Sequence, residues 1–345
     1  MKFIDLRSDT VTEQPIFMKE AMFNAEVGDD VYRDDPTVIK LEKLAAEIVG
    51  MESALFVPSG TFGNQLALFT HCKRGSEVII ADSNHIIAHE VGASSVIAGV
   101  QLRTIDAPNG VLNPNEIEKR IRFEDDDIHF PSTSLICVEN AHSSGNVLSI
   151  ENMKAVYDIA KKYNLPVHLD GARLFNASTA LNVDVKEITK YCDSVMFCLS
   201  KGLCSPVGSI LAGSKDFIDK ARKKRKLMGG GLRQAGFLAA AGIVSLEVMT
   251  KRLKEDHDNA KLLAEELSKI PEIYVDLHNL KINMVFFSFK DKNIDTKELV
   301  KYFLENNIKI NDVENGLMRF VTHYWVTKDD IYKIIEVLKT FLYER

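Results

Sequence analysis

The chain has 345 residues, 46% of them hydrophobic, with 43 basic and 49 acidic side chains and a formal net charge of −6. This length is enough for a large core in two domains, and the acidic balance excludes a general electrostatic attraction to nucleic acid or to an anionic membrane. The N-terminus lacks the apolar segment of a secretory signal, and no run approaches the ~18 apolar residues of a spanning helix. We therefore expect a cytoplasmic protein with small-molecule ligands.

The cysteines are odd in number, contain no CxxC pair, and several lie in apolar runs: Cys72, Cys137, Cys192, Cys198 and Cys204. Thiols in such runs pack as small hydrophobic groups. We expect them to be reduced, and we expect no zinc ribbon.

From about residue 54 to residue 213, short apolar runs alternate with amphipathic stretches. The runs typical of strands are 54–59, 77–82, 100–106, 134–140, 165–170, 194–200 and 208–214. Helix-like segments such as 113–121 and 150–164 lie between them. This alternation predicts βαβ units and a mostly parallel sheet between helices, with ligands beyond the carboxyl ends of the strands.

The C-terminal part follows another pattern. One long helical region spans 236–270, and strand-like runs at 284–290 and 317–325 alternate with helical stretches at 296–307 and 328–345. The pattern predicts a small α+β domain. We expect an N-terminal arm over residues 1–25, a large domain over 26–246 and a small C-terminal domain over 247–345.

A candidate phosphate site lies in "PSGTFGNQLALF", where Gly60 and Thr61 follow a strand and begin a helix. Free backbone N–H groups and the helix dipole at such a point bind phosphate. An ordinary capped turn remains the alternative. The absence of a lysine excludes a Walker loop.

Two further candidates lie at strand ends. Asp170 ends the run "VHLD" and is followed by Arg173, and Lys201 follows the run "SVMFCLS". Separately, a loop cap and a surface lysine would explain them. Together, an amine that forms Schiff bases, a carboxylate for a pyridinium N–H and a phosphate site are the three attachments of pyridoxal phosphate.

The stretches "IDLRSDTVT", "VGDDVYRDDPTV", "HLDGARLFNA", "SVMFCLSKGL" and "MGGGLRQAG" resemble the low-specificity L-threonine aldolases, pyridoxal-phosphate enzymes of fold type I in the β-eliminating lyase group. The resemblance covers essentially the whole chain. It implies an α/β fold of the fold type I transferase-like kind, with a mostly parallel seven-stranded sheet between helices and a smaller C-terminal α+β domain. It also implies a homo-oligomer, usually a dimer of dimers.

The resemblance implies roles around the cofactor. Lys201 would bind the cofactor aldehyde, Asp170 would pair with the pyridine nitrogen, and Arg173 would contact the ring phenolate oxygen. Gly60 and Thr61 would bind the phosphate.

It implies further roles around the substrate and a neighbouring subunit. His85 would stack on the cofactor ring, Ser8 and Arg319 would hold the substrate carboxylate, and Lys226 and Arg233 would reach the phosphate of a neighbouring site. Independently, Arg319 lies in an apolar strand, where an unpaired guanidinium is costly, so an anionic partner is expected; a structural salt bridge would serve equally.

The implied reaction is retro-aldol cleavage of L-threonine or L-allo-threonine to glycine and an aldehyde. The base for the β-hydroxyl proton would be His85, His129 or a water that they order. A β-eliminating lyase or an aminotransferase would use the same lysine and aspartate and remains an alternative, as does a non-catalytic protein of this fold. His85 and His89 are four residues apart but lack a third ligand in register, so we expect no metal.

Two departures from the family pattern lie near the cofactor. Cys204 occupies a position after the lysine where small residues are usual, which predicts sensitivity of the activity to oxidation. His89 and Ala93 replace an aromatic residue and a glycine. These changes bear on substrate range more than on the reaction type.

Overall fold

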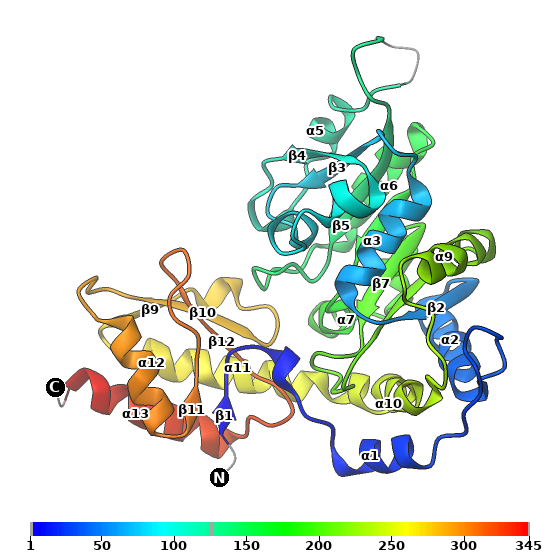
Figure 1. Ribbon diagram of the computed structural model, residues 1–345. Coiled ribbons are helices and arrows are strands. Elements are labelled where there is room, and N and C mark those ends of the chain that lie inside the picture. The colour runs from blue at the N-terminus through cyan, green and yellow to red at the C-terminus, as the bar shows by residue number, and fades with distance from the viewer. Residues whose placement is uncertain (1–2, 124–126, 344–345) are drawn as a thin grey trace.

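The computed structural model describes residues 3–123 and 127–343 (Figure 1). A seven-stranded sheet forms the centre of the large domain. Its strands are β2 (Ser53–Val57), β3 (Glu77–Ala81), β4 (Gln101–Ile105), β5 (Thr133–Glu139), β6 (Val167–Asp170), β7 (Ser194–Cys198) and β8 (Ser209–Gly213). They lie in the order β2-β8-β7-β6-β5-β3-β4, and only the pairs that include β8 are antiparallel. The predicted mostly parallel seven-stranded α/β sheet is thus confirmed.

Helices cover both faces of this sheet. They are α2 (Pro36–Val49), α3 (Gly60–His71), α4 (His85–Ala88), α5 (Pro114–Glu118), α6 (Ile150–Lys162), α7 (Leu174–Leu181), α8 (Lys186–Thr189), α9 (Lys215–Leu227) and α10 (Gly236–Glu247), with short turns η2 (Ser94–Ala98) and η3 (Pro108–Gly110). Phe56 packs in one core with Leu41 of α2, whereas its neighbours Leu55 and Val57 pack in another with Phe217 of α9. Burial on both faces explains why the strands read as continuous apolar runs.

The predicted long helical region is interrupted. α10 ends at Glu247, a short turn η4 (Met249–Arg252) follows, and α11 spans Leu253–Ser268. Most of α10 is buried, and it packs on α2, whereas α11 packs on elements of the small domain. The helical path is therefore interrupted at Val248, between a helix packed in the large domain and one packed in the small domain.

The small domain contains an antiparallel sheet and flanking helices, as predicted. Its sheet has the order β12-β10-β9, with β9 (Ile273–Val275), β10 (Met284–Phe289) and β12 (Met318–Val321). The turn η5 (Leu277–Asn279) and the helices α12 (Thr296–Glu305) and α13 (Lys328–Tyr343) complete it with α11. Phe287, Phe303 and Phe320 are fully buried in its separate core.

The N-terminal arm contacts both domains. Strand β1 (Ile4–Asp5) pairs in parallel with β11 (Ile308–Lys309) of the small domain, the turn η1 (Asp9–Val11) follows, and α1 (Ile16–Phe23) packs on α10. In Figure 1 the arm, in dark blue, runs across the base of the molecule from one domain to the other. The residue boundaries expected for the arm and the two domains stay predictions. In the described part of the chain, no helix is both long and apolar enough to cross a membrane.

Candidate active site

The carboxyl ends of adjacent strands bring the main candidates together. Lys201 follows β7, Asp170 ends β6, Glu139 ends β5 and His85 follows β3. In the sheet register Glu139 lies opposite Asp170, and Asp170 lies opposite Met196 of β7. The strand order therefore gathers side chains that are more than 100 residues apart in the sequence at one edge of the sheet.

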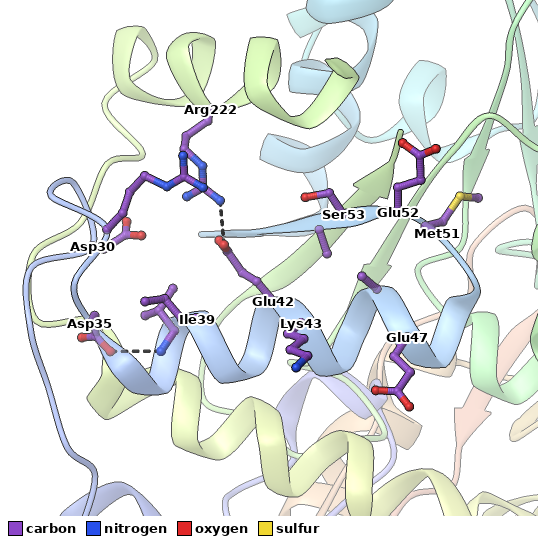
Figure 2. Close-up of a pocket in the computed structure, with 14 residues that line it drawn as sticks. Asp30, Asp35, Ile39, Glu42, Lys43, Glu47, Met51, Glu52, Ser53 and Arg222 are labelled. Atoms are coloured by element: carbon purple, nitrogen blue, oxygen red, sulfur yellow. Dashed lines mark hydrogen bonds and ion pairs between the residues drawn. The ribbon is translucent and has the colours of Figure 1, made fainter. Parts of the chain in front are cut away.

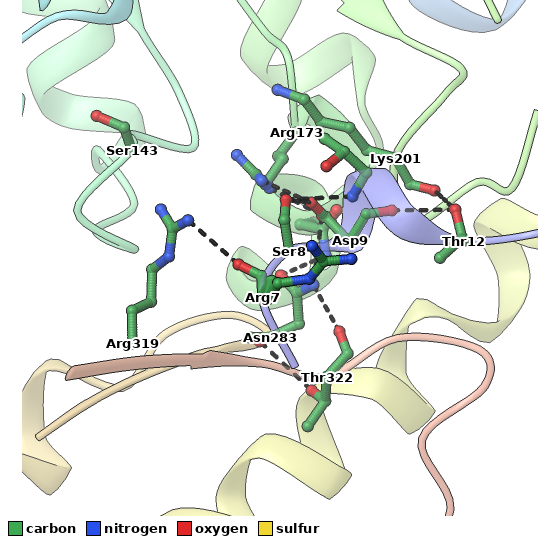
Figure 3. Close-up of polar contacts among 12 residues, drawn as sticks. Arg7, Ser8, Asp9, Thr12, Ser143, Arg173, Lys201, Asn283, Arg319 and Thr322 are labelled. Atoms are coloured by element: carbon green, nitrogen blue, oxygen red, sulfur yellow. Dashed lines mark hydrogen bonds and ion pairs between the residues drawn. The ribbon is translucent and has the colours of Figure 1, made fainter. Parts of the chain in front are cut away.

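Lys201 is half-buried and is held through its backbone. The hydroxyl of Thr12, from the arm, donates to the Lys201 carbonyl at 2.7 Å, as Figure 3 shows. The Lys201 ammonium lies near enough to Asp9 and Asp170 to favour the charged form of both carboxyls. The amine is thus held at the mouth of the sheet, among acidic groups.

Asp170 is buried and accepts two hydrogen bonds. Its Oδ1 accepts from the backbone N–H of Ala172 at 3.1 Å, and its Oδ2 accepts from Asn64 Nδ2 at 2.7 Å. Burial and the nearby charge of Glu90 raise the pKa of Asp170, although His85 and Lys201 oppose the rise. A cation placed beside this carboxylate would therefore be stabilised.

Asp9 and Arg173 form a buried ion pair between the arm and the large domain (Figure 3). Arg173 Nη2 donates to Asp9 Oδ1 at 2.6 Å and Nε donates to Oδ2 at 2.9 Å. Burial of Asp9 opposes its ionisation, but Arg173, with Lys201 and Asn283, holds the pKa of this carboxyl well below its usual range. The sequence interpretation chose Ser8 and missed Asp9, because nothing in the arm reveals which residue turns toward Arg173.

Glu90 orients His85. The Nδ1 of His85 lies 3.0 Å from Glu90 Oε1, and the backbone N–H of His85 donates to Glu139 Oε2 at 2.7 Å. Hydrogen bonding to Glu90 raises the pKa of His85, against the effect of burial, and the ring stays 32% exposed. The ring of His89 lies 5.4 Å from that of His85 between centroids. Glu90 was not among the site residues predicted from the sequence.

Burial and the charge of Asp170 raise the pKa of Glu139 to about 7. Its carboxyl also accepts from the backbone N–H of Ser143 at 2.7 Å. Glu139 thereby holds the loop after β5 beside the start of α4. It was not predicted from the sequence, where it reads as the end of an apolar run.

The start of α3 has the features of a phosphate site. Ser59 caps the helix by accepting from the N–H of Phe62 at 3.2 Å. The N–H groups of Gly60 and Thr61, in the first turn, have no acceptor within the helix. A Cβ at Gly60 would lie 2.9 Å from Cys198 Sγ, so only glycine allows this close approach of the helix to β7.

Arg319 projects from β12 toward the large domain and faces Ser143 across the site in Figure 3. It is half-buried, and its Nη2 donates to the backbone carbonyl of Arg7 at 3.3 Å rather than to a carboxylate. Burial and the charge of Arg173 lower its pKa. Nearby, Ser8 caps η1 through its hydroxyl. A ligand carboxylate would complete the pairing of Arg319.

Three predicted site residues do not join this cluster within one chain. His129 precedes β5 and so lies on the side of the amino ends of the strands, whereas Lys201 lies at their carboxyl ends. The ring of His129 is exposed and lies 2.6 Å from Asp127. Lys226 is exposed at the end of α9, and Arg233 is exposed and pairs with Asp29 at 2.9 Å. Their predicted roles stay predictions.

Cys204 is more buried than the expectation of oxidation sensitivity assumes. All five cysteines are free and buried, and burial raises the pKa of Cys204 to about 12. Thiols become reactive when they are exposed and ionised. Burial and the raised pKa argue against the predicted sensitivity to oxidation, which stays a prediction.

A cavity of about 500 Å³ lies away from the cluster, between α2 and α9 (Figure 2). Glu42 and Arg222 form an ion pair across it at 2.6 Å. None of the predicted cofactor residues lines it. This cavity is therefore separate from the cluster at the strand ends.

Comparison with known proteins identifies the family. Residues 5–290 match the model of the β-eliminating lyase family. The chain belongs to this family. A low-specificity L-threonine aldolase of Arabidopsis thaliana is 45% identical to this chain, over 96% of this chain and 94% of that protein. The low-specificity L-threonine aldolase of Escherichia coli K12 is 44% identical, over 98% and 99%.

A solved structure of a similar protein has the same fold as this chain. A threonine aldolase of Leishmania major superposes with a TM-score of 0.83 at 20% identity, covering 98% of this chain and 99% of that one. At that identity the likeness concerns the fold. It supports the fold type I architecture expected from the sequence.

The side chains at the strand ends suit pyridoxal phosphate, the cofactor expected for this β-eliminating lyase. Asp170 is a buried carboxylate beside another, Glu90, and a pyridinium N–H would add a cation next to these two acidic groups. His85, Glu90 and Asp170 also offer ligand atoms within 4.8 Å of one another, a spacing that suits a metal. Asn64 already bridges the two carboxylates with its amide N–H groups, which favours the organic cofactor.

Proposed function

We propose that this protein is a pyridoxal-phosphate-dependent carbon–carbon lyase that cleaves L-threonine and L-allo-threonine to glycine and acetaldehyde, and related β-hydroxy-α-amino acids to other aldehydes. The observation that carries the proposal is the placement of Lys201 and Asp170 at the carboxyl ends of adjacent strands, in a chain 44–45% identical over almost its full length to low-specificity L-threonine aldolases. When bound, pyridoxal phosphate supplies the electron sink for the breaking Cα–Cβ bond.

The chain supplies the attachments for this cofactor. Lys201 would provide the amine for its aldehyde, Asp170 would hold the N–H of its ring, and Arg173 would contact its phenolate oxygen. Gly60 and Thr61 would hold its phosphate at the start of α3, where N–H groups and the helix dipole favour an anion.

Arg319 and Ser8 orient the substrate. The half-buried guanidinium of Arg319 pairs with the substrate carboxylate, and the Ser8 hydroxyl adds a hydrogen bond. Fixing the carboxylate on the small-domain side holds the Cα–Cβ bond in the one orientation that weakens it. The same restraint disfavours transamination, which needs the Cα–H bond in that orientation.

His85 takes the β-hydroxyl proton. In the neutral ring, an Nδ1–H that donates to Glu90 leaves Nε2 free to accept a proton. His129 stands at the other edge of its own sheet, so only a neighbouring subunit could bring it to the site. It remains the second candidate for the base, through an ordered water.

We propose that the protein works in the cytoplasm as a homotetramer, a dimer of dimers. Lys226 and Arg233 are exposed, which leaves both side chains accessible to a neighbouring subunit. In this assembly they would contact the phosphate at that subunit's site. The five free buried thiols agree with a reducing compartment. Beyond its own copies, we propose small amino acids as its ligands and neither nucleic acid nor membrane.

The test is a product analysis with L-threonine and with L-allo-threonine. The proposal predicts glycine and acetaldehyde in equal amounts, and none from a Lys201→Ala variant. β-Elimination would instead give 2-oxobutyrate and ammonia, and transamination would give a 2-oxo acid. A wild-type protein that forms 2-oxo acids without glycine would replace this function with one of those two alternatives.

A further inference from the structure

A series of hydrogen-bonded side chains leads from Asp170 toward the amino end of β7. Asn64 Nδ2 lies 2.7 Å from Asp170 Oδ2, and Asn64 Oδ1 lies 3.2 Å from His168 Nε2. His168 Nδ1 lies 2.9 Å from the Ser194 hydroxyl, which lies 2.8 Å from His71 Nε2. The chain of contacts thus passes from α3 through β6 and β7 and returns to the end of α3. Of these residues, the proposed mechanism uses only Asp170.

The two carboxylates fix the orientation of the Asn64 amide. Its nitrogen lies 2.7 Å from Asp170 Oδ2 and 2.9 Å from Glu90 Oε1, so both of its N–H groups donate to carboxylates. The reversed amide would place its oxygen against both acids. Asn64 Oδ1 therefore faces His168, and His168 Nε2 must carry the proton that it donates.

The remaining contacts have one direction of donation. Because His168 Nε2 carries the proton, a neutral ring accepts at Nδ1 from the Ser194 hydroxyl, and the Ser194 oxygen accepts from His71 Nε2–H. Every donor in this series has one acceptor. His168 is fully buried, and burial lowers its pKa to about 3, in agreement with a neutral ring.

We propose that His168 is a positioning residue for Asp170: acting through Asn64, it keeps an N–H pointed at the carboxylate that receives the cofactor ring, while Ser194 and His71 fix its tautomer. The proposal rests on the proposed function for the identity of the cofactor. Without the His168 donor, Asn64 Oδ1 is buried without a partner, and the side chain is free to shift away from Asp170 toward another donor. Asp170 then loses a hydrogen bond that favours its charged form, and its contact with the ring weakens.

The first test compares three variants of the apoprotein for binding of pyridoxal phosphate. His168→Leu removes both ring nitrogens, and His168→Gln can restore a donor and an acceptor. Thr189→Val removes another buried hydroxyl, which donates to the carbonyls of Val49 and Val185 and has no part in this network. We expect a Kd about tenfold weaker for His168→Leu, with a changed visible spectrum of the bound cofactor. His168→Gln should recover most of the affinity, and Thr189→Val should match the wild type.

A folded His168→Leu with the affinity and spectrum of the wild type would overturn the proposal, as would a His168→Gln no better than His168→Leu. If His168→Leu does not fold, a second measurement decides. Nitrogen-15 NMR of the wild-type apoprotein, labelled at its nine histidines, reports the tautomer directly. We expect a neutral His168 with its proton on Nε2 at neutral pH; a proton on Nδ1, or on both nitrogens, contradicts the proposal.

Neither measurement uses threonine, so the two proposals fail separately. If the product analysis shows no glycine but His168→Leu still weakens cofactor binding, the proposed reaction is wrong and the positioning role stands. If glycine and acetaldehyde form but the His168 tautomer is reversed, the reaction stands and the positioning role is wrong.

Discussion

At the scale of single residues, Glu90 controls the protonation of His85. Its hydrogen bond raises the pKa of His85 above the ordinary value of 6.5. A general base must be neutral, so activity should fall as the pH drops through this pKa. Glu90→Gln removes the anionic partner and lowers the pKa of His85, and it also removes a charge that raises the pKa of Asp170. The acid limb of the kcat/KM profile should therefore move to lower pH.

Steady-state assays across pH check this. The control is Glu77→Gln, a buried glutamate at the amino end of β3 that pairs with Arg103 and Arg122. Its acid limb should stay in place. An acid limb of Glu90→Gln that is unmoved or moves to higher pH argues against His85 as the base.

Residue chemistry was only partly predictable. Lys201 and Asp170 follow apolar runs, and a parallel sheet brings such ends together, so the sequence pointed to both. Asp9, Asn64 and Glu90 come from the arm, a helix and a loop, and they meet the site only through the tertiary fold. Local sequence carries no signal for such meetings beyond the presence of polar residues near a predicted strand end.

At the scale of elements, the loop after β7 contains a left-handed residue that is not glycine. Cys204 has φ of 64° and is fully buried. A β-branched residue adopts this conformation poorly. Cys204→Val should lower the free energy of unfolding by about 2 kcal/mol. Cys137→Val, a fully buried cysteine within β5, is the matched control and should change stability by less, because strands accept valine.

Urea unfolding of both variants gives the comparison. Equal losses would mean that the backbone of Cys204 imposes no demand of its own. The longer elements were predictable, because most of the central strands are apolar runs. The short strands β1, β9 and β11 were not, since two or three residues give no periodicity. The break between α10 and α11 was also missed, because helical sequence continues through it.

At the scale of the whole molecule, the arm links the two domains. Asp9 is fully buried against Arg173 of the large domain, while β1 is paired with β11 of the small domain. Removing one partner of a buried ion pair leaves an uncompensated charge. Asp9→Ala should lower the free energy of unfolding by about 3–5 kcal/mol. Asp5→Ala, which breaks a pair with the half-exposed Arg7, should cost less than about 1 kcal/mol.

The pH dependence of this difference follows from the lowered pKa of Asp9. The stabilisation is complete above the unfolded value of 3.8 and is lost only as the pH falls through the lower folded value. The free energies of unfolding of the wild type and of Asp9→Ala should therefore differ by a constant amount at neutral and mildly acidic pH. A difference that already shrinks near pH ~6 would show that Asp9 is not held ionised in this way. Sequence could not place the arm, because β1 and β11 lie some 300 residues apart.

The central claim is that Lys201 carries the cofactor of this chain. The most direct measurement is borohydride reduction of the protein with bound pyridoxal phosphate, followed by peptide mapping of the modified residue. We expect the label on Lys201 in the peptide that contains "CLSKGL", and none on a Lys201→Ala variant. A label on another lysine, such as Lys226, would contradict the account.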